Sequence, residues 1–121
     1  MKQVASFDLQ EPKIRKDEIL VVKDKYFHGK NVAVVTGAAS GVGRATAIAL
    51  AANGLTVVGT DVIEEGGKET VKMAEPLGGK VIFVKADLTK DEEIESCVRQ
   101  ATQYGSIKFL ANIYFSKSHF T

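Results

Sequence analysis

The chain has 121 residues, of which 45% are hydrophobic and 26% charged, and its 16 basic and 15 acidic side chains leave a net charge of +1. This composition is typical of a globular domain, and the balanced charge excludes a chain-wide basic surface for nucleic acid. Cys97 is the only cysteine, which excludes an internal disulfide and a cysteine-based zinc cluster. Residues 1–16 hold no signal-peptide core, and no apolar run reaches the roughly 20 residues that span a bilayer. We therefore expect a cytoplasmic protein with no metal, no nucleic acid and no membrane among its partners.

The first part of the chain differs in composition from the rest. Residues 1–25 hold Pro12, many charges and one apolar run at 19–22. We predict an N-terminal extension over 1–27, mostly solvated, with one short strand at 19–23, followed by a domain over 28–121.

From residue 31 onward, short β-branched runs alternate with longer helical segments. Strands are predicted at 32–35, 56–60, 81–84 and 107–113, and helices at 42–53, 64–75 and 89–104. In the first helix, Val42, Ala45, Ala49 and Ala52 fall on one face. Thr89 and Glu92 fit a capping box at the start of the third. This alternation predicts an α/β fold with right-handed crossovers and a parallel sheet.

A glycine-rich turn, residues 36–43, connects the first strand to the first helix. Glycines at 37, 41 and 43 allow a sharp bend and a close approach of the backbone to a ligand, and the helix that follows directs its amides at the same space. A pyrophosphate suits this geometry, while packing alone is the alternative explanation. A P-loop is excluded, because Val42 stands where that motif needs glycine and no Lys-Ser/Thr pair follows.

Asp61 ends the second predicted strand, 18 residues after Gly43. A carboxylate at this distance accepts hydrogen bonds from an adenosine ribose and repels a 2′-phosphate. No Lys or Arg lies within 38–41, and Arg44 is expected to point along the helix. The cofactor is therefore predicted to be NAD rather than NADP. The alternative is that Asp61 only caps the helix near Glu64.

The segment 31–43 resembles the cofactor turn of the short-chain dehydrogenase/reductase family, whose Thr-Gly-x-x-x-Gly-x-Gly pattern it matches completely. The resemblance extends over residues 28–113. It implies a Rossmann-like, doubly wound parallel sheet of strand order 3-2-1-4 and an NAD-dependent oxidoreductase acting on a secondary alcohol or ketone. The resemblance places the following residues at the cofactor: Gly37, Ser40, Gly41, Val42, Gly43, Asp61, Val62, Asp87, Leu88 and Asn112. Asp87 is otherwise a turn residue, and Asn112 a strand cap.

The family pattern stops after Asn112. Ile113 replaces a second Asn, and Tyr114 and Phe115 replace a small Ala-Gly pair. The family's catalytic Ser and Tyr-x-x-x-Lys would follow later, so no catalytic residue is assigned. Two Tyr-x-x-x-Lys matches, Tyr26/Lys30 and Tyr104/Lys108, are interrupted by glycine and are interpreted as coincidental. Tyr114 and Lys117 have the wrong spacing.

This break predicts an incomplete sheet with Phe109, Leu110 and Ala111 on an uncovered edge that invites self-association. We expect a truncated or frameshifted enzyme that is inactive by itself, its parent acting on a small molecule. The alternatives are a non-catalytic nucleotide-binding or association module, or a remnant that does not fold. Cys97 is expected to be buried and inert, and His28 and His119 are expected to bind no metal.

Overall fold

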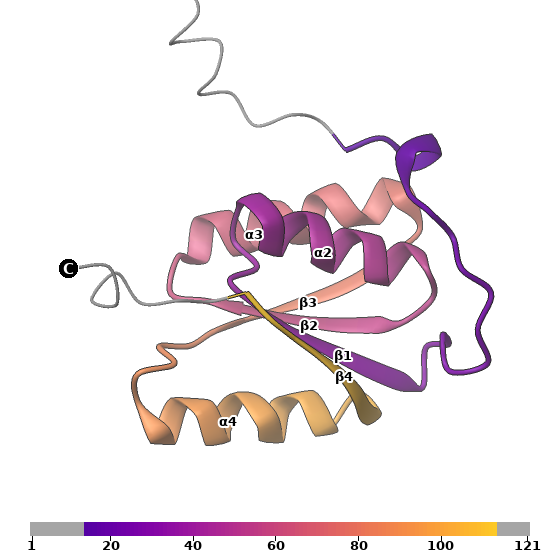
Figure 1. Ribbon diagram of the computed structural model, residues 1–121. Coiled ribbons are helices and arrows are strands. Elements are labelled where there is room, and N and C mark those ends of the chain that lie inside the picture. Colours follow the sequence, from indigo (N-terminus) through magenta and orange to yellow (C-terminus); the bar gives the residue numbers. More distant parts are fainter. Residues whose placement is uncertain (1–13, 114–121) are drawn as a thin grey trace, which may run out of the picture.

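The computed structural model describes residues 14–113, in which four parallel strands form one sheet between two layers of helices (Figure 1). The strands are β1 (Asn31–Thr36), β2 (Thr56–Asp61), β3 (Lys80–Lys85) and β4 (Ser106–Asn112). They pair in the order β3-β2-β1-β4, and all three pairings are parallel. The prediction of a Rossmann-like α/β fold with strand order 3-2-1-4 is confirmed.

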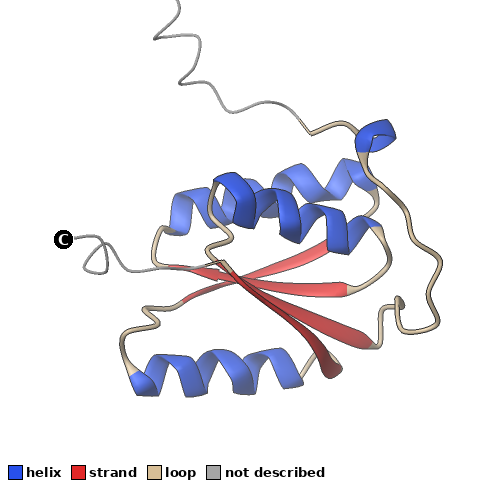
Figure 2. Ribbon diagram, viewed as in Figure 1, coloured by secondary structure: helices blue, strands red, loops and turns tan. Residues whose placement is uncertain are grey.

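The helices connect these strands as crossovers. They are α2 (Gly41–Ala52), α3 (Glu64–Ala74), extended by the short 3-10 helix η2 (Glu75–Leu77), and α4 (Asp91–Thr102). Helices α2 and α3 cover one face of the sheet, and α4 covers the other (Figure 2). Within residues 14–113, no helix combines the length and the apolar character that crossing a bilayer requires.

Strand β1 lies at the centre of the hydrophobic core and is buried along its whole length. Its side chains alternate between the two faces, as the pleat of a strand requires. Ala33 and Val35 join the cluster under α2 and α3, whereas Val32 and Val34 join the cluster under α4. Because β1 is covered on both sides, its sequence is a continuous apolar run rather than an alternation with polar residues.

The buried face of α2 is not the face that Val42, Ala45, Ala49 and Ala52 share. Val42 is 70% exposed and Ala45 is also exposed, whereas the buried residues are Gly43, Arg44, Ala47, Ile48 and Ala51. In an alanine-rich helix nearly every position is apolar, so the spacing of apolar residues does not select one face. The buried face is rotated by about one position from the face that Val42, Ala45, Ala49 and Ala52 share, and it includes Arg44.

The predicted capping box of α4 is also wrong. The helix begins at Asp91 with Lys90 as its N-cap, and no side chain caps its amides. The Thr89 hydroxyl donates instead to Asp87 Oδ1 at 2.7 Å, and Glu93, not Glu92, reaches back to accept from the Asp87 amide at 2.9 Å. The Asp87 carboxylate competes successfully for Thr89, because a bond to a charged acceptor is stronger than one to a neutral group.

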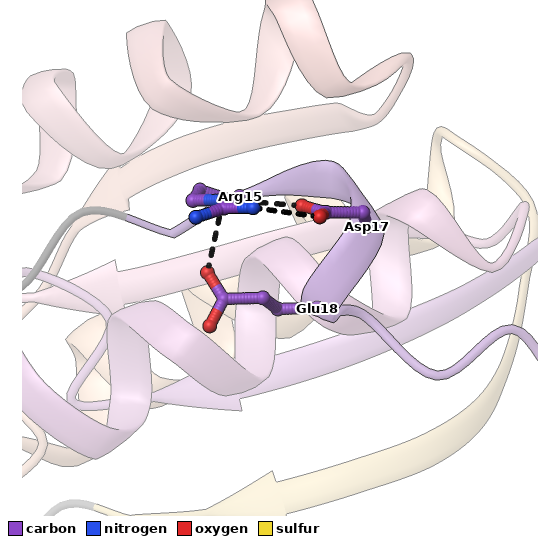
Figure 3. Close-up of polar contacts among 3 residues, drawn as sticks. All are labelled: Arg15, Asp17 and Glu18. Atoms are coloured by element: carbon purple, nitrogen blue, oxygen red, sulfur yellow. Dashed lines mark hydrogen bonds and ion pairs between the residues drawn. The ribbon is translucent and has the colours of Figure 1, made fainter.

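The segment before β1 contains the 3-10 helix η1 (Lys16–Glu18) but no strand at 19–23, contrary to prediction. Asn53 at the end of α2 takes the place of a partner strand: its Oδ1 accepts from the Val22 amide at 2.6 Å, and its Nδ2 donates to the Leu20 carbonyl at 2.9 Å. Arg15 contacts Asp17 and Glu18 beside η1 (Figure 3). All three side chains are well exposed, so these ion pairs contribute little to stability.

Most described residues of this segment are exposed, as predicted, but three apolar side chains are partly buried. Ile14, Ile19 and Phe27 pack against the core cluster under α2 and α3. The Phe27 ring meets the Phe109 ring edge-on, with centroids 5.6 Å apart. The predictions that concern Pro12, Tyr114, Phe115, Lys117 and His119 fall outside the described residues.

Strand β4 forms one edge of the sheet. Its register with β1 shifts where Val32 pairs with Ile107 and Ala33 with Phe109, so Lys108 is an extra residue. The expectation that 109–111 are uncovered is partly wrong, because Phe109 and Ala111 are half-buried against the core, whereas Leu110 is 67% exposed. One apolar side chain of the three therefore remains open to solvent.

Candidate functional site

The candidate site lies at the edge of the sheet where all four parallel strands end. Thr36, Asp61, Lys85 and Asn112 are the last residues of β1, β2, β3 and β4. From β1 the chain adds β2 and then β3 on one side of β1, and it then crosses back to add β4 on the other side. This reversal of direction beside β1 is the place where open α/β sheets bind ligands.

The glycine-rich turn follows β1 at this edge. Its glycines are needed for two reasons, a left-handed backbone conformation and a close approach of α2 to β1. Gly37 and Gly41 have positive φ angles of 70° and 57°, which a residue with a side chain adopts only at a cost. A Cβ on Gly43 would lie 1.8 Å from the Gly37 carbonyl oxygen, so only glycine lets α2 start this close to the end of β1. A Cβ on Gly41 would meet no atom within 4 Å among residues 14–113 beyond its own neighbours in the chain. The described residues therefore leave room above Gly41 for a close approach to its backbone.

The amino end of α2 faces this space without a negative charge of its own. Ser40 is the N-cap and makes no side-chain cap hydrogen bond, and the first turn carries no acidic residue. The first turns of α3 and α4 each carry acidic residues. The first amides of a helix lack intrahelical acceptors and sit at the positive end of its dipole, so this end of α2 suits an external anion.

Asp61 lies against the turn rather than away from it. Its Oδ2 accepts from the Ala39 amide at 3.1 Å, and its Oδ1 accepts from the Ile63 amide at 3.1 Å. The second bond reaches the N-cap residue of α3, so the carboxylate also helps to start that helix. Each carboxylate oxygen can accept a second hydrogen bond, and the side chain is only half-buried. The carboxylate thus retains acceptor capacity for a ligand.

The loop after β3 lies beside Asp61. The Ala86 amide donates to the Asp61 carbonyl at 3.1 Å, which places Asp87 and Leu88 next to the end of β2. Asp87 Oδ1 accepts from the Thr89 hydroxyl at 2.7 Å and from the Thr89 amide at 3.0 Å, and these two bonds lower the pKa of Asp87 below its usual value. Asp87 is therefore a turn residue, and its second oxygen, Oδ2, remains available to a ligand. Val62 is 44% exposed at the same edge.

Asn112 joins the edge strand β4 to the neighbouring strand β1 where both strands end. Its Oδ1 accepts from the Thr36 hydroxyl at 2.8 Å, and the same hydroxyl accepts from the Ile113 amide at 2.8 Å. These bonds close the gap between β1 and β4 directly beneath the start of the glycine-rich turn.

Arg44 is a residue of this site that the sequence analysis did not identify. It does not point along α2 as expected. Its side chain is 8% exposed and bonds to the Ala39 carbonyl, the Gly66 carbonyl and the Thr70 hydroxyl. One signal in the sequence was available, since Arg44 precedes Ile48 by four residues and so shares its helix face.

The reactive side chains considered in the sequence lie elsewhere. Tyr26 and Lys30 precede β1, Tyr104 and Lys108 flank the start of β4, and the Ser106 amide donates to the Lys30 carbonyl at 3.0 Å. Both pairs therefore lie at the amino ends of the strands, opposite the glycine-rich turn. Cys97 is buried under the sheet, and burial raises the pKa of its thiol.

The chain matches the family model of short chain dehydrogenases over residues 31–113. It is 37% identical over 86 residues to an uncharacterized oxidoreductase of Thermotoga maritima, covering 71% of this chain and 34% of that protein. It is 40% identical over 82 residues to a 3-oxoacyl-(acyl-carrier-protein) reductase of the same organism, covering 67% and 33%. The chain thus spans about a third of the length of these relatives.

Solved structures are similar over the same part of the chain. A short chain dehydrogenase/reductase from Burkholderia phymatum, in complex with NAD, superposes with a TM-score of 0.65 at 36% identity, over 70% of this chain and 30% of that one. A glucose dehydrogenase of Caenorhabditis elegans gives a TM-score of 0.70 at 28% identity, over 78% and 41%. The motif, the fold and these similarities agree: the chain belongs to the short-chain dehydrogenase/reductase family of oxidoreductases.

Proposed function

We propose that residues 28–121 form the NAD-binding part of an oxidoreductase that transfers a hydride between a secondary alcohol or ketone and nicotinamide. One observation carries the proposal. A Cβ on Gly41 would meet no atom of another described residue within 4 Å, and Asp61 is bonded to the same turn through the Ala39 amide. A group with two phosphates and an adjoining ribose has the chemistry to occupy both places.

The residues at this edge fit the adenosine half of the cofactor. The backbone of Gly37 and of residues 40–42 would hold the pyrophosphate, and Gly43 lets the helix start close to the strand. The free acceptor positions of Asp61 would bind the ribose hydroxyls. Val62, Asp87 and Leu88 would contact the adenine, and Asn112 would steady the sheet beneath. The nicotinamide supplies the hydride chemistry when it is bound.

Charge supports NAD over NADP. A 2′-phosphate would lie against the Asp61 carboxylate, and like charges repel. Arg44 does not reach the proposed position of this phosphate, because its guanidinium is buried against Ala39, Gly66 and Thr70. The NAD-bound relative from Burkholderia phymatum supports the same preference by analogy.

The activity of the whole protein is a separate proposal. The family acts on small-molecule substrates, but the relatives named above extend over about three times the matched length. The described residues hold two Tyr-x-x-x-Lys pairs, and both lie at the opposite edge of the sheet. We therefore propose that this chain binds the cofactor and does not by itself turn over substrate.

Calorimetric titration with NAD and NADP tests the proposal. We expect wild-type protein to bind NAD more tightly than NADP. Asp61→Asn removes the charge and should weaken NAD binding by roughly tenfold while narrowing the difference between the two cofactors. Asp91→Asn makes the same change of charge on α4 and should alter neither affinity.

An NADH oxidation assay with a panel of ketones accompanies the titration. Equal affinities of wild type and Asp61→Asn for NAD would contradict the assigned role of the carboxylate. Robust turnover by the 121-residue chain would contradict the proposed lack of catalytic groups.

Exposed Leu110 on the edge strand β4 favours a second candidate, a module that associates with another chain. An open edge offers unpaired backbone groups to a further strand. Light scattering distinguishes this function. A dimer that dissociates in Leu110→Lys would support pairing at this edge, whereas a monomeric wild type would exclude it.

A further inference from the structure

We propose that Arg44 and Thr70 are positioning residues that hold the glycine-rich turn in its binding shape by tying Ala38 and Ala39 to α3. This inference rests on the proposed function, since it assigns the turn to a dinucleotide. Neither residue needs to touch the ligand; both act through the backbone that would.

Arg44 forms the first half of the connection. Its Nη2 donates to the Ala39 carbonyl at 2.6 Å and to the Gly66 carbonyl at 3.1 Å, and its Nε donates to the Thr70 hydroxyl at 3.0 Å. One planar guanidinium thus joins α2, the turn and α3. Hydrogen bonds from a charged donor are stronger than neutral ones, and burial shields them from water.

Thr70 forms the second half. Its side chain is 1% exposed, and its hydroxyl donates to the Ala38 carbonyl at 2.7 Å while it accepts from Arg44. The carbonyls of two successive turn residues are therefore both engaged by side chains. The amide of Ala39 is engaged as well, by Asp61.

The backbone of α3 comes unusually close to the turn at the same point. A Cβ on Gly66 would lie 2.5 Å from the Ala39 carbonyl oxygen and 2.9 Å from the Ala39 Cβ. Glycine at this position lets the helix approach closely enough for Thr70 and the Gly66 carbonyl to reach their partners. The contact is therefore built into the backbone of α3 as well as into its side chains.

The functional consequence concerns the direction of the carbonyls. A carbonyl oxygen that turned toward the pyrophosphate would repel it. With the oxygens of Ala38 and Ala39 bonded to Thr70 and Arg44, neither peptide can rotate without losing a buried hydrogen bond. The turn is then ordered before the ligand arrives, which reduces the entropy cost of binding.

The first measurement needs no ligand. The amides of Ala38 and Ala39 are hydrogen-bonded to the Thr60 carbonyl and to Asp61, so their hydrogen exchange should be slow in wild type and in Thr70→Ser, which keeps the hydroxyl. Thr70→Val and Arg44→Met remove the bonds and should lose this protection. Ala101→Gly is the control: it lies on α4, on the other face of the sheet, and should destabilise the domain without contacting the turn. In this variant the turn amides should exchange no faster, compared with the other amides of the domain, than they do in wild type.

The second measurement is the affinity for NAD by calorimetry. We expect Thr70→Val and Arg44→Met to bind roughly five- to tenfold more weakly than wild type, with Thr70→Ser close to wild type. Ala101→Gly should bind like wild type even where its melting temperature falls as far as that of Thr70→Val. A purely structural role for Thr70 would instead make affinity follow melting temperature in all variants.

The two readouts separate the possible failures. Unchanged exchange protection in Thr70→Val and Arg44→Met would overturn the inference whatever the ligand result. Lost protection with unchanged NAD affinity would overturn the positioning role but leave the proposed function standing. Absence of NAD binding by wild type would overturn the proposed function, and the role toward a dinucleotide with it.

Discussion

Comparing Gly41→Ala with Gly78→Ala separates two effects of an added methyl group: strain in the backbone, and loss of the space proposed for the ligand. Gly41 has a φ angle of 57°, and Gly78, at the end of η2, has a φ of 80°. A Cβ at either position would meet no atom within 4 Å in the described part of the chain, apart from its own neighbours in sequence. Alanine at either site should therefore cost only the left-handed strain, about 1–2 kcal/mol of the free energy of unfolding. For a domain of this size, each kcal/mol lowers the melting temperature by roughly 4–8 °C.

The two variants should differ in what they bind. The new methyl group of Gly41→Ala projects into the space proposed for the pyrophosphate, whereas Gly78 lies near the amino end of β3, at the opposite edge of the sheet. We expect Gly41→Ala to bind NAD at least about tenfold more weakly, a loss of about 1.4 kcal/mol, and Gly78→Ala to bind like wild type. Calorimetric titration beside thermal unfolding measures both effects. Equal NAD affinity in the two variants would refute the placement of the phosphates above Gly41.

Three further predictions follow from single side chains. The pKa of Asp87 is lowered in the folded protein, so the ionised carboxylate stabilises the fold fully above about pH 3.8, its ordinary pKa, and this stabilisation is lost as the pH falls through the lower folded pKa. Asp87→Asn should therefore have a smaller free energy of unfolding than wild type at pH 7, and urea unfolding should show that the difference vanishes in acid. The Cys97 thiol is buried and its pKa is raised, so at pH 8 it should react with iodoacetamide far more slowly in native than in unfolded protein. Mass spectrometry measures the two rates, and equal rates would contradict the burial of the thiol. The buried Thr60 hydroxyl has no partner of good hydrogen-bond geometry within the described part of the chain and interacts only weakly with the Cys97 thiol, so Thr60→Val should raise the free energy of unfolding by up to about 1 kcal/mol, and a loss of stability would contradict this environment.

The strands and the glycine-rich turn could be predicted because local chemistry determines them. A β-branched run such as 32–35 is buried on both faces, and only glycine satisfies the backbone at 37, 41 and 43, so residue type alone identifies both features. The position of Asp61 was predictable for a similar reason, since the end of β2 must lie beside the end of β1 in a parallel pair.

Features that depend on tertiary contacts could not be predicted in the same way. Arg44 is charged, and its burial becomes favourable only because two carbonyls and a hydroxyl from the turn and α3 meet it. Thr89 has two acceptable partners in its local sequence, and the geometry of the loop selects Asp87. The extended run at 19–23 has the composition of a strand, but the amide of Asn53 bonds to it from a helix.

The most direct test of the central claim is to map NAD binding on the backbone amides by NMR titration. We expect saturable shifts that are largest at 37–43, 61–62 and 87–88, the three segments that meet at the carboxyl ends of β1, β2 and β3. Shifts confined to the groove lined by Glu64, Lys68 and Lys85, or no saturable shifts at all, would contradict the central claim.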